Sequence, residues 1–228
     1  MPANYLHSQS VQYTSGDKMK IKKMKIKVSD YFIDSEIAIK EASRFNILII
    51  HGASNDMHYP LLENIFNNLA ENYTVMRFNF SFVKGKKPQI RRNLNETEAC
   101  IKVLGHKNLI LIGKSYGGHI SILETLRHSD KVLKSIILGY SIHEENNPSN
   151  VNNKMIWRFK GIKNKLFFII GDKDKMCNIK IFKKNLPYIK YRTVRGSHSF
   201  KNDRNKITHA NFMLVNKLIL MEISNLEE

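Results

Sequence analysis

Residues 20–28 are the first segment of the chain with a regular hydropathy pattern. Lysine alternates for the most part with isoleucine, methionine or valine, which is the period of a half-exposed β-strand. Residues 29–30 and 34–35 offer turns, and residues 36–40 would return as a second strand. The pattern therefore predicts an antiparallel hairpin at one edge of a sheet, where the lysines oppose mispairing with another chain.

From residue 45 onward the apolar positions form continuous runs instead, as in strands that are buried on both faces. Such runs cover residues 46–50, 109–113, 135–139 and 165–170, and residues 74–80 and 189–194 read as two further strands. Segments with helical spacing lie between them, at residues 61–69, 90–104, 116–126 and 179–186, and a last one follows at residues 207–223. Strands that alternate with helices predict an α/β fold with a mostly parallel, doubly wound sheet.

The same pattern predicts how the chain divides. Residues 19–228 read as one α/β domain, and the polar residues 1–18 read as a flexible N-terminal arm. The span between the runs at 135–139 and 165–170 includes a loop at 146–153 and is too short for a large cap domain. We therefore expect an open or shallowly covered site.

Cysteine content and the N-terminus indicate the compartment. Cys100 and Cys177 are the only cysteines and belong to no paired motif, so both are expected as free thiols in a reducing compartment. The first ten residues lack the apolar core of a signal peptide, and no run reaches the ~18 apolar residues of a membrane span. We expect a cytoplasmic protein.

The net charge is +17, from 37 lysines and arginines against 20 acidic residues. Such a charge attracts anionic partners. The lysines are spread along the whole chain, however, and aromatic residues do not interleave with them as base stacking on a nucleic acid requires. Compositional bias is therefore favoured over nucleic-acid binding.

Residues 113–117 (Gly-Lys-Ser-Tyr-Gly) carry the most specific motif, G-x-S-x-G, between a buried strand and a helix. In that context a sharp turn exposes a serine hydroxyl at the top of a sheet. A phosphate-binding loop is the rival interpretation, because Gly-Lys-Ser also ends that motif. It requires glycine five residues before Gly113, and position 108 is Asn108. Ser115 is therefore a candidate nucleophile.

A serine nucleophile needs a histidine base and a carboxylate that orients the histidine. His198 follows the last predicted strand, which gives the order Ser, Asp, His that is typical of α/β-hydrolases. The alternative for such a residue is a surface-loop histidine, which is what we expect of His7, His58, His128 and His143.

The acid has several candidates. Asp172 and Asp174 both follow the strand at 165–170. Asp174 is favoured because it lies further into the loop, and because Asp172 could cap the following turn. A carboxylate after the preceding strand, Glu144 or Glu145, is a third option.

An acyl-transfer site also needs backbone N–H groups that stabilise an oxyanion. One would be that of Tyr116, directly after the nucleophile, at a helix N-terminus. The other would be that of Ala53, in the loop after the first parallel strand. His51 is expected to anchor this loop. His51 and His58 have no metal-ligand spacing, so we expect neither a metal nor a cofactor.

Five segments together resemble a known family: residues 45–57, 77–80 with the 85–88 loop, 113–118, 171–174 and 196–200. They resemble the small, cap-less α/β-hydrolases of the dienelactone-hydrolase-like group over residues 24–225. The branch that looks closest includes the hydrolase-like domain of a chromatin-complex regulatory subunit. The resemblance implies that Ser115 is the nucleophile, Asp174 the acid, His198 the base, and Ala53 and Tyr116 the oxyanion hole.

Two positions depart from that family. Dienelactone hydrolases proper use cysteine where this chain has Ser115, so their substrate does not carry over. An acidic residue often precedes the histidine, and here Ser197 stands at that position. The reaction type is therefore better indicated than the substrate.

The sequence thus predicts a serine carboxylesterase that acts on a small acyl compound, with Phe82 and Trp157 as candidate walls of the acyl pocket. The alternative is a non-catalytic α/β-hydrolase-fold module that uses its basic surface to bind an anionic partner.

Overall fold

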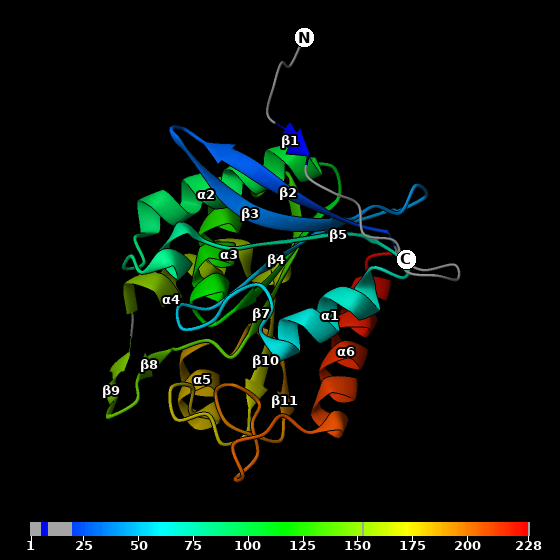
Figure 1. Cartoon of the computed structure of the whole chain (residues 1–228). Helices are drawn as coiled ribbons and strands as arrows, with labels where there is room; N and C mark the ends of the chain where they lie inside the picture. The colour runs from blue at the N-terminus through cyan, green and yellow to red at the C-terminus, as the bar shows by residue number, and fades with distance from the viewer. Residues whose placement is uncertain (1–5, 9–19, 152, 228) are drawn as a thin grey trace.

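A computed structural model describes residues 6–8, 20–151 and 153–227. A nine-stranded sheet, in the order β1-β2-β3-β5-β4-β6-β7-β10-β11, runs through the centre of the molecule (Figure 1). In this order, the neighbouring pairs from β1 to β5 are antiparallel. The pairs from β5 to β11 are parallel. The predicted parallel sheet with an N-terminal antiparallel hairpin is therefore confirmed.

The strands of this sheet are β1 (Leu6–Ser8), β2 (Ile21–Val28), β3 (Tyr31–Ala38), β4 (Asn46–Ile50), β5 (Thr74–Phe78), β6 (Leu109–Lys114), β7 (Val132–Leu138), β10 (Leu166–Gly171) and β11 (Lys190–Val194). The helices are α1 (Pro60–Leu69), α2 (Ile90–Leu104), α3 (Tyr116–Arg127), α4 (Asn153–Phe159), α5 (Ile179–Asn185) and α6 (His209–Ser224). Two 3₁₀ segments are η1 (Ser81–Lys84) and η2 (Lys160–Lys165).

The apolar run of β4 shows how the sheet forms two cores. Ile47 and Ile49 face the core that α1 and α6 cover. Leu48 and Ile50 face the opposite core, which α2 and α3 cover. Figure 1 shows the two pairs of helices on opposite sides of the sheet. Because successive side chains of a strand point to opposite faces, a strand between two helical layers must be apolar at every position.

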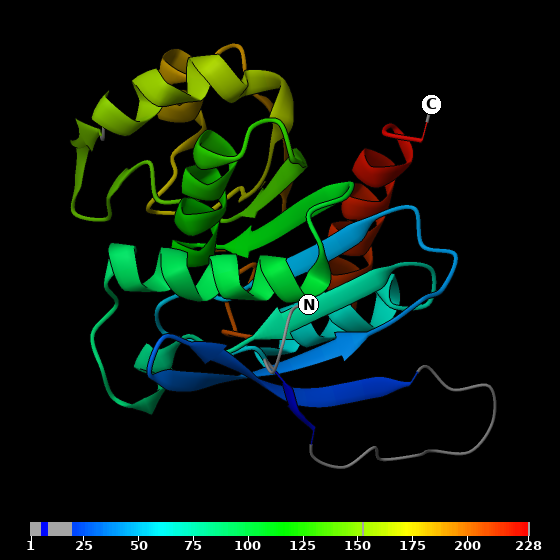
Figure 2. The same ribbon diagram turned by 90° about the horizontal axis from the view of Figure 1, so that it is seen from above.

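The N-terminal hairpin differs in its bounds from the prediction. Its turn is at residues 29–30, and β3 already begins at Tyr31, so residues 34–35 lie inside a strand. The polar residues there are accommodated by pairing: Ser35 Oγ donates to the carbonyl of Met24, and Glu36 forms a buried ion pair with Arg77. Figure 2 shows β2 and β3 at the outer edge of the sheet.

The predicted N-terminal arm, residues 1–18, lies outside the described residues except for β1. In β1, Leu6–Ser8 pair with β2, in the register Leu6 opposite Ile26. None of the helices in the described part of the chain has the length and hydropathy needed to cross a bilayer.

The segment between β7 and β10 is more regular than predicted. The expected loop at 146–153 contains β9 (Asn147–Val151), which pairs with β8 (His143–Glu144) as a small hairpin, and α4 and η2 follow. This insertion is short, and the described chain carries no large cap domain. The carboxyl ends of β4, β6, β10 and β11 are followed by the loops that hold the candidate site.

Candidate active site

Ser115 lies at the sharp turn between β6 and α3. Its φ of 52° and ψ of −112° lie outside the regions that L-residues ordinarily occupy. The backbone N–H of Ser115 donates to the carbonyl of Leu138 in β7, at 2.9 Å, which fixes the turn to the neighbouring strand. The predicted strand–turn–helix context of this serine is thus present.

Close backbone packing explains the glycines around the turn. A Cβ at Gly113 would collide with the carbonyl of Gly117. A Cβ at Gly117 would collide with the carbonyl of Ile50 and lie 2.6 Å from that of His51. Only glycine leaves room for both approaches, which hold the first turn of α3 against the ends of β6 and β4.

Ser115, His198 and Asp174 lie in one hydrogen-bonded row. His198 Nε2 lies 2.9 Å from Ser115 Oγ, and His198 Nδ1 lies 2.8 Å from Asp174 Oδ2. The Asp174 side chain is fully buried, whereas that of His198 is 19% exposed. If Nδ1 carries the ring proton, Nε2 has a free lone pair that can accept the hydroxyl proton of Ser115.

The other oxygen of Asp174 is also held. Its Oδ1 accepts a hydrogen bond from the backbone N–H of Met176, at 2.8 Å. Because the carboxylate is bonded on both oxygens, its orientation toward the imidazole is fixed.

The alternative acids have other partners. Asp172 Oδ1 accepts from the N–H of Gly196, Glu144 accepts from the side chain of Asn150, and Glu145 lies 3.7 Å from Lys175. Of the four carboxylates considered from the sequence, Asp174 is therefore the one whose hydrogen bond reaches His198.

The loop after β4 packs beside the turn. A Cβ at Gly52 would lie 3.3 Å from the carbonyl of Lys114 and 3.5 Å from Ser115 Cβ, so the loop that continues into Ala53 packs against the turn of the nucleophile. Tyr116 is the first residue of α3, and its N–H therefore has no acceptor within the helix. The two predicted oxyanion donors, Ala53 and Tyr116, thus follow directly on Gly52, which packs against the turn, and on Ser115 itself.

His51 holds this loop in place. Its Nδ1 lies 2.7 Å from the carbonyl of Gly52, and its Nε2 accepts from the backbone N–H of Phe80. Burial lowers the pKa of His51 to about 4, so the ring is neutral at neutral pH and can donate at Nδ1 while accepting at Nε2. These contacts agree with the anchoring role expected for His51.

The two aromatic residues expected at an acyl pocket have different surroundings. Phe82 is buried, and its ring centroid lies 5.9 Å from that of Tyr116. It also lines a hollow of about 520 Å³ together with Ala53 and Tyr59. Trp157 lies on α4 and is 73% exposed, so its ring faces solvent and does not wall an enclosed pocket.

Lys114 is a residue of the site that the sequence analysis missed. Its side chain is almost fully buried, and its Nζ lies 3.3 Å from the place of a Cβ at Gly139. Burial lowers the pKa of Lys114 to about 8, although the negative charge of Asp174 acts in the opposite direction. A lysine inside G-x-S-x-G gives no sequence signal of its burial, since it looks like an ordinary surface residue.

His143 was expected on the surface but is buried. Its Nε2 accepts from the backbone N–H of Asn178, and its Nδ1 lies 2.8 Å from the carbonyl of Glu144. His143 therefore fixes the start of the β8–β9 hairpin against the N-terminus of α5.

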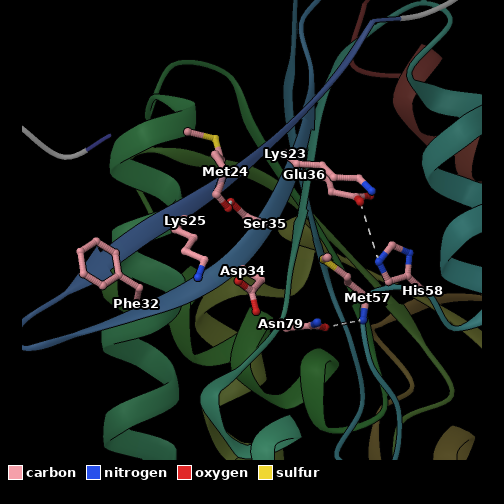
Figure 3. Close-up of a pocket in the computed structure, with 10 residues that line it drawn as sticks. All are labelled: Lys23, Met24, Lys25, Phe32, Asp34, Ser35, Glu36, Met57, His58 and Asn79. Carbon is pink, nitrogen blue, oxygen red and sulfur yellow. Dashed lines mark hydrogen bonds and ion pairs between the residues drawn. The ribbon is translucent and has the colours of Figure 1, made fainter. Parts of the chain in front are cut away.

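A second hollow, of about 550 Å³, lies on the β2–β3 hairpin (Figure 3). Lys23, Lys25, Asp34, Glu36 and His58 contribute charged or titratable side chains to it. None of its lining residues belongs to the Ser115, His198 and Asp174 row. A mixed set of charges without a nucleophile–base pair makes it a weaker candidate for chemistry than Ser115.

Comparison with known proteins agrees with this geometry. The family described as alpha/beta hydrolase domain matches residues 43–219. A solved structure of a predicted CIB-like hydrolase from Thermoplasma acidophilum is 18% identical, with a TM-score of 0.68 over 89% of this chain and 99% of that one.

Two further similar structures have named activities. An esterase of Pyrococcus furiosus is 14% identical, with a TM-score of 0.68 over 89% of this chain and 93% of that one. A dienelactone hydrolase of Anabaena variabilis is 13% identical, with a TM-score of 0.67 over 88% and 95%. At these identities the likeness shows the fold, which confirms the predicted α/β-hydrolase fold. The expected branch, near a chromatin-complex subunit, stays a prediction.

Proposed function

Because this chain belongs to the α/β-hydrolase family, we propose that it is a serine hydrolase that cleaves carboxylic esters through an acyl-enzyme. The observation that carries the proposal is the row Ser115–His198–Asp174, with contacts of 2.9 and 2.8 Å. Serine is a poor nucleophile at neutral pH unless a positioned base removes its proton, and His198 Nε2 is within reach of that proton.

In the acylation step, Ser115 Oγ attacks the ester carbonyl carbon while His198 Nε2 takes the hydroxyl proton. Asp174, held by Met176 N–H, stabilises the imidazolium that forms. The tetrahedral oxyanion accepts hydrogen bonds from the backbone N–H groups of Ala53 and Tyr116. The intermediate collapses, the C–O bond to the alcohol breaks, and His198 returns the proton to the leaving alkoxide.

Deacylation repeats the steps of acylation, with water in place of Ser115 as the nucleophile. His198 removes a proton from water, the hydroxide attacks the acyl carbon, and the acid leaves as Ser115 regains its proton. Every proton is moved by His198, so the reaction needs no cofactor.

The hollow beside the loop after β4 suggests the substrate class. Its walls include Phe82 and Ala53, and Ala53 is one of the two proposed oxyanion donors, although Ser115, His198 and Asp174 do not themselves line it. A small ester suits this open hollow better than a long chain, because the described chain has no cap domain to cover one. We propose a carboxylesterase for short acyl esters. Trp157, being exposed, would act at most at the rim.

We also propose a cytoplasmic location. Cys100 and Cys177 are both buried free thiols, and burial raises the pKa of each. Unpaired thiols of this kind suit a reducing compartment.

The experiment combines covalent labelling with kinetics. A fluorophosphonate probe should label the wild type once, and p-nitrophenyl acetate, butyrate and octanoate should be hydrolysed at rates that fall with chain length. Ser115→Ala should lose labelling and about 10⁴-fold or more in kcat/KM. Ser149→Ala, at an exposed serine of β9, is the matched control and should behave as wild type. Unlabelled wild type, or equal labelling of Ser115→Ala, would contradict the proposal.

A further inference from the structure

Three side chains that commonly bind metals converge away from Ser115. Glu98 lies in α2, and Glu124 and His128 lie at the C-terminal end of α3. Their ligand atoms lie within 4.8 Å of one another. Because α3 starts next to Ser115 and a helix rises ~1.5 Å per residue, the cluster is separated from the nucleophile by about the full length of that helix.

The atoms that face one another in this cluster have no hydrogen-bond partner among the described residues. They are Oε2 of Glu98, Oε2 of Glu124 and Nε2 of His128, and all three are buried. The Glu124 side chain is 0% exposed. Buried polar atoms are nearly always paired, and an unpaired buried carboxylate oxygen carries a high desolvation cost. Three buried, unpaired ligand atoms that face one another are suited to bind a shared cation.

A simple ion pair explains this arrangement poorly. His128 Nε2 lies 3.0 Å from Glu98 Oε2 and 3.6 Å from Glu124 Oε2. Neither contact is a hydrogen bond: the ring N–H is not aligned with Glu98 Oε2 at 3.0 Å, and Glu124 Oε2 at 3.6 Å is too distant. The two carboxylates would also repel each other in the absence of a cation between them.

The other oxygen of each carboxylate has a basic side chain near it. Glu124 Oε1 accepts from Arg127 at 3.0 Å, and Glu98 Oε1 lies 4.0 Å from Lys102 Nζ. A hydrogen-bond donor such as Arg127 orients a metal-binding carboxylate and leaves its other oxygen available. The arrangement is therefore one in which Oε2 of each glutamate is available as a ligand.

We propose that Glu98, Glu124 and His128 form a binding site for a zinc-class divalent cation. Zinc bonds to nitrogen and carboxylate oxygen at ~2.0–2.2 Å in a tetrahedron, which places ligand atoms roughly 3.4 Å apart. The two separations from His128 Nε2, 3.0 and 3.6 Å, lie on either side of that value. An imidazole ligand favours zinc over magnesium or calcium, which take oxygen ligands.

The surroundings leave both an entry path and a further ligand. The Glu98 and His128 side chains are 18% and 21% exposed, so the cation can enter from solvent. Nδ1 of His106 is another buried nitrogen without a partner among the described residues, and its ring centroid lies 6.3 Å from that of His128. Water or a rotated His106 would complete the tetrahedron.

The site would join α2 to α3. Unlike the proposed hydrolysis, its function would be structural, because cation binding to the native state alone raises stability by mass action. Removal of the cation should therefore lower the Tm and leave ester hydrolysis at moderate temperature unchanged.

The test uses untagged protein, stripped with a chelator and dialysed, because a histidine tag would itself bind zinc. Titration with zinc against a chromophoric chelator should give one site per chain, and cobalt(II) should give the visible absorption of tetrahedral coordination. His128→Asn and Glu98→Gln should each lower zinc affinity at least about tenfold and abolish the zinc-dependent rise in Tm. Circular dichroism and the esterase rate report whether each variant is folded.

His58→Asn is the matched control. His58 also lies between two glutamates, Glu36 and Glu63, but it is 45% exposed and does not belong to the convergent cluster. This variant should bind zinc as the wild type does. The absence of a one-to-one site, wild-type affinity in the His128 and Glu98 variants, or an equal loss in His58→Asn would each overturn the proposal.

Discussion

Asp172 and Gly196 are joined by a hydrogen bond of 2.7 Å, from the backbone N–H of Gly196 to Oδ1 of Asp172. The neighbouring N–H of Lys173 donates to the carbonyl of Gly196 at 2.9 Å. The loop after β10 is thus tied to the loop after β11, two residues before His198. Asp172 fixes the position of the histidine loop, whereas Asp174 contacts the imidazole itself.

These two aspartates should respond differently to substitution. Asp174→Asn should lower kcat by about 10³- to 10⁴-fold with the fold retained, because the amide no longer favours the required imidazole tautomer. Asp172→Ala should cost about 1–3 kcal/mol in the free energy of unfolding, because it removes a hydrogen-bond acceptor for Gly196. Its kcat should fall about tenfold or less. Ester kinetics measure kcat and urea denaturation measures the free energy of unfolding in each variant. A larger kcat loss in Asp172→Ala than in Asp174→Asn would reverse the roles given to the two aspartates.

Gly117→Ala should disrupt the packing of α3 on β4. Its Cβ would meet the carbonyl oxygens of Ile50 and His51, which are backbone atoms and cannot rotate away. We expect a loss of about 3 kcal/mol or more in the free energy of unfolding, since overpacking against backbone is not easily relieved. Urea denaturation measures the loss.

Gly161→Ala is the control for that variant. Gly161 lies in η2, and no atom lies within 4 Å of the place its Cβ would take. Its free energy of unfolding should stay within about 0.5 kcal/mol of wild type. Equal effects at Gly117 and Gly161 would contradict the close approach of α3 to β4.

The buried His51 should make the free energy of unfolding depend on pH in the acid range. Its pKa is lowered from 6.5 to about 4 in the native state, so between these values the unfolded chain binds a proton that the native state does not. The free energy of unfolding should therefore fall as the pH drops through this window, by up to about 3 kcal/mol from this residue. His51→Gln should lack that fall, so its deficit relative to wild type should shrink between pH 6.5 and 4. A constant deficit would show that His51 does not resist protonation.

The buried Lys114 should make the free energy of unfolding depend on pH in the alkaline range. Its pKa is lowered from 10.5 to about 8, so between these values the unfolded chain holds a proton that the native state has lost. Wild-type stability should rise with pH across that window by up to about 3 kcal/mol relative to Lys114→Met. Urea denaturation at several pH values measures the difference. Lys107→Met, at an exposed lysine, controls for the loss of one charge, and the same slope in both variants would contradict burial of Lys114.

The fold was predictable because its strongest signal is local. Runs such as residues 47–50 and 109–113 have no polar position to turn toward water, so each requires helices on both faces. The order of Ser115, Asp174 and His198 then followed from topology, since the carboxyl ends of parallel strands meet at one edge of the sheet. The structure brings these three side chains into contact.

Features that depend on pairing between distant residues were less predictable. The strand β3 continues through residues 34–35, where a turn was predicted, because Ser35 Oγ donates to the carbonyl of Met24 in β2, a partner that hydropathy alone does not reveal. The β8–β9 hairpin forms from an asparagine-rich segment with low strand propensity, and His143 is buried there by a contact with Asn178.

The exposed Trp157 shows a related limit. An aromatic residue on a short helix can face either the core or solvent, and a seven-residue helix such as α4 is too short for a clear periodicity. The proposed cation site was only partly recognisable in the sequence. Glu124 and His128 are four residues apart and share a helix face, but Glu98 joins them only through the packing of α2 on α3.

The backbone of Ser115 places activity and stability in opposition. A non-glycine residue with a φ of 52° and a ψ of −112° costs about 1–3 kcal/mol of stability, and glycine at the same position would relieve most of that strain. If stability alone were selected, Ser115 would therefore be among the first residues to change. A chain that retains serine there accepts a less stable fold in return for an exposed hydroxyl, and engineering for thermostability at this turn would remove the proposed nucleophile.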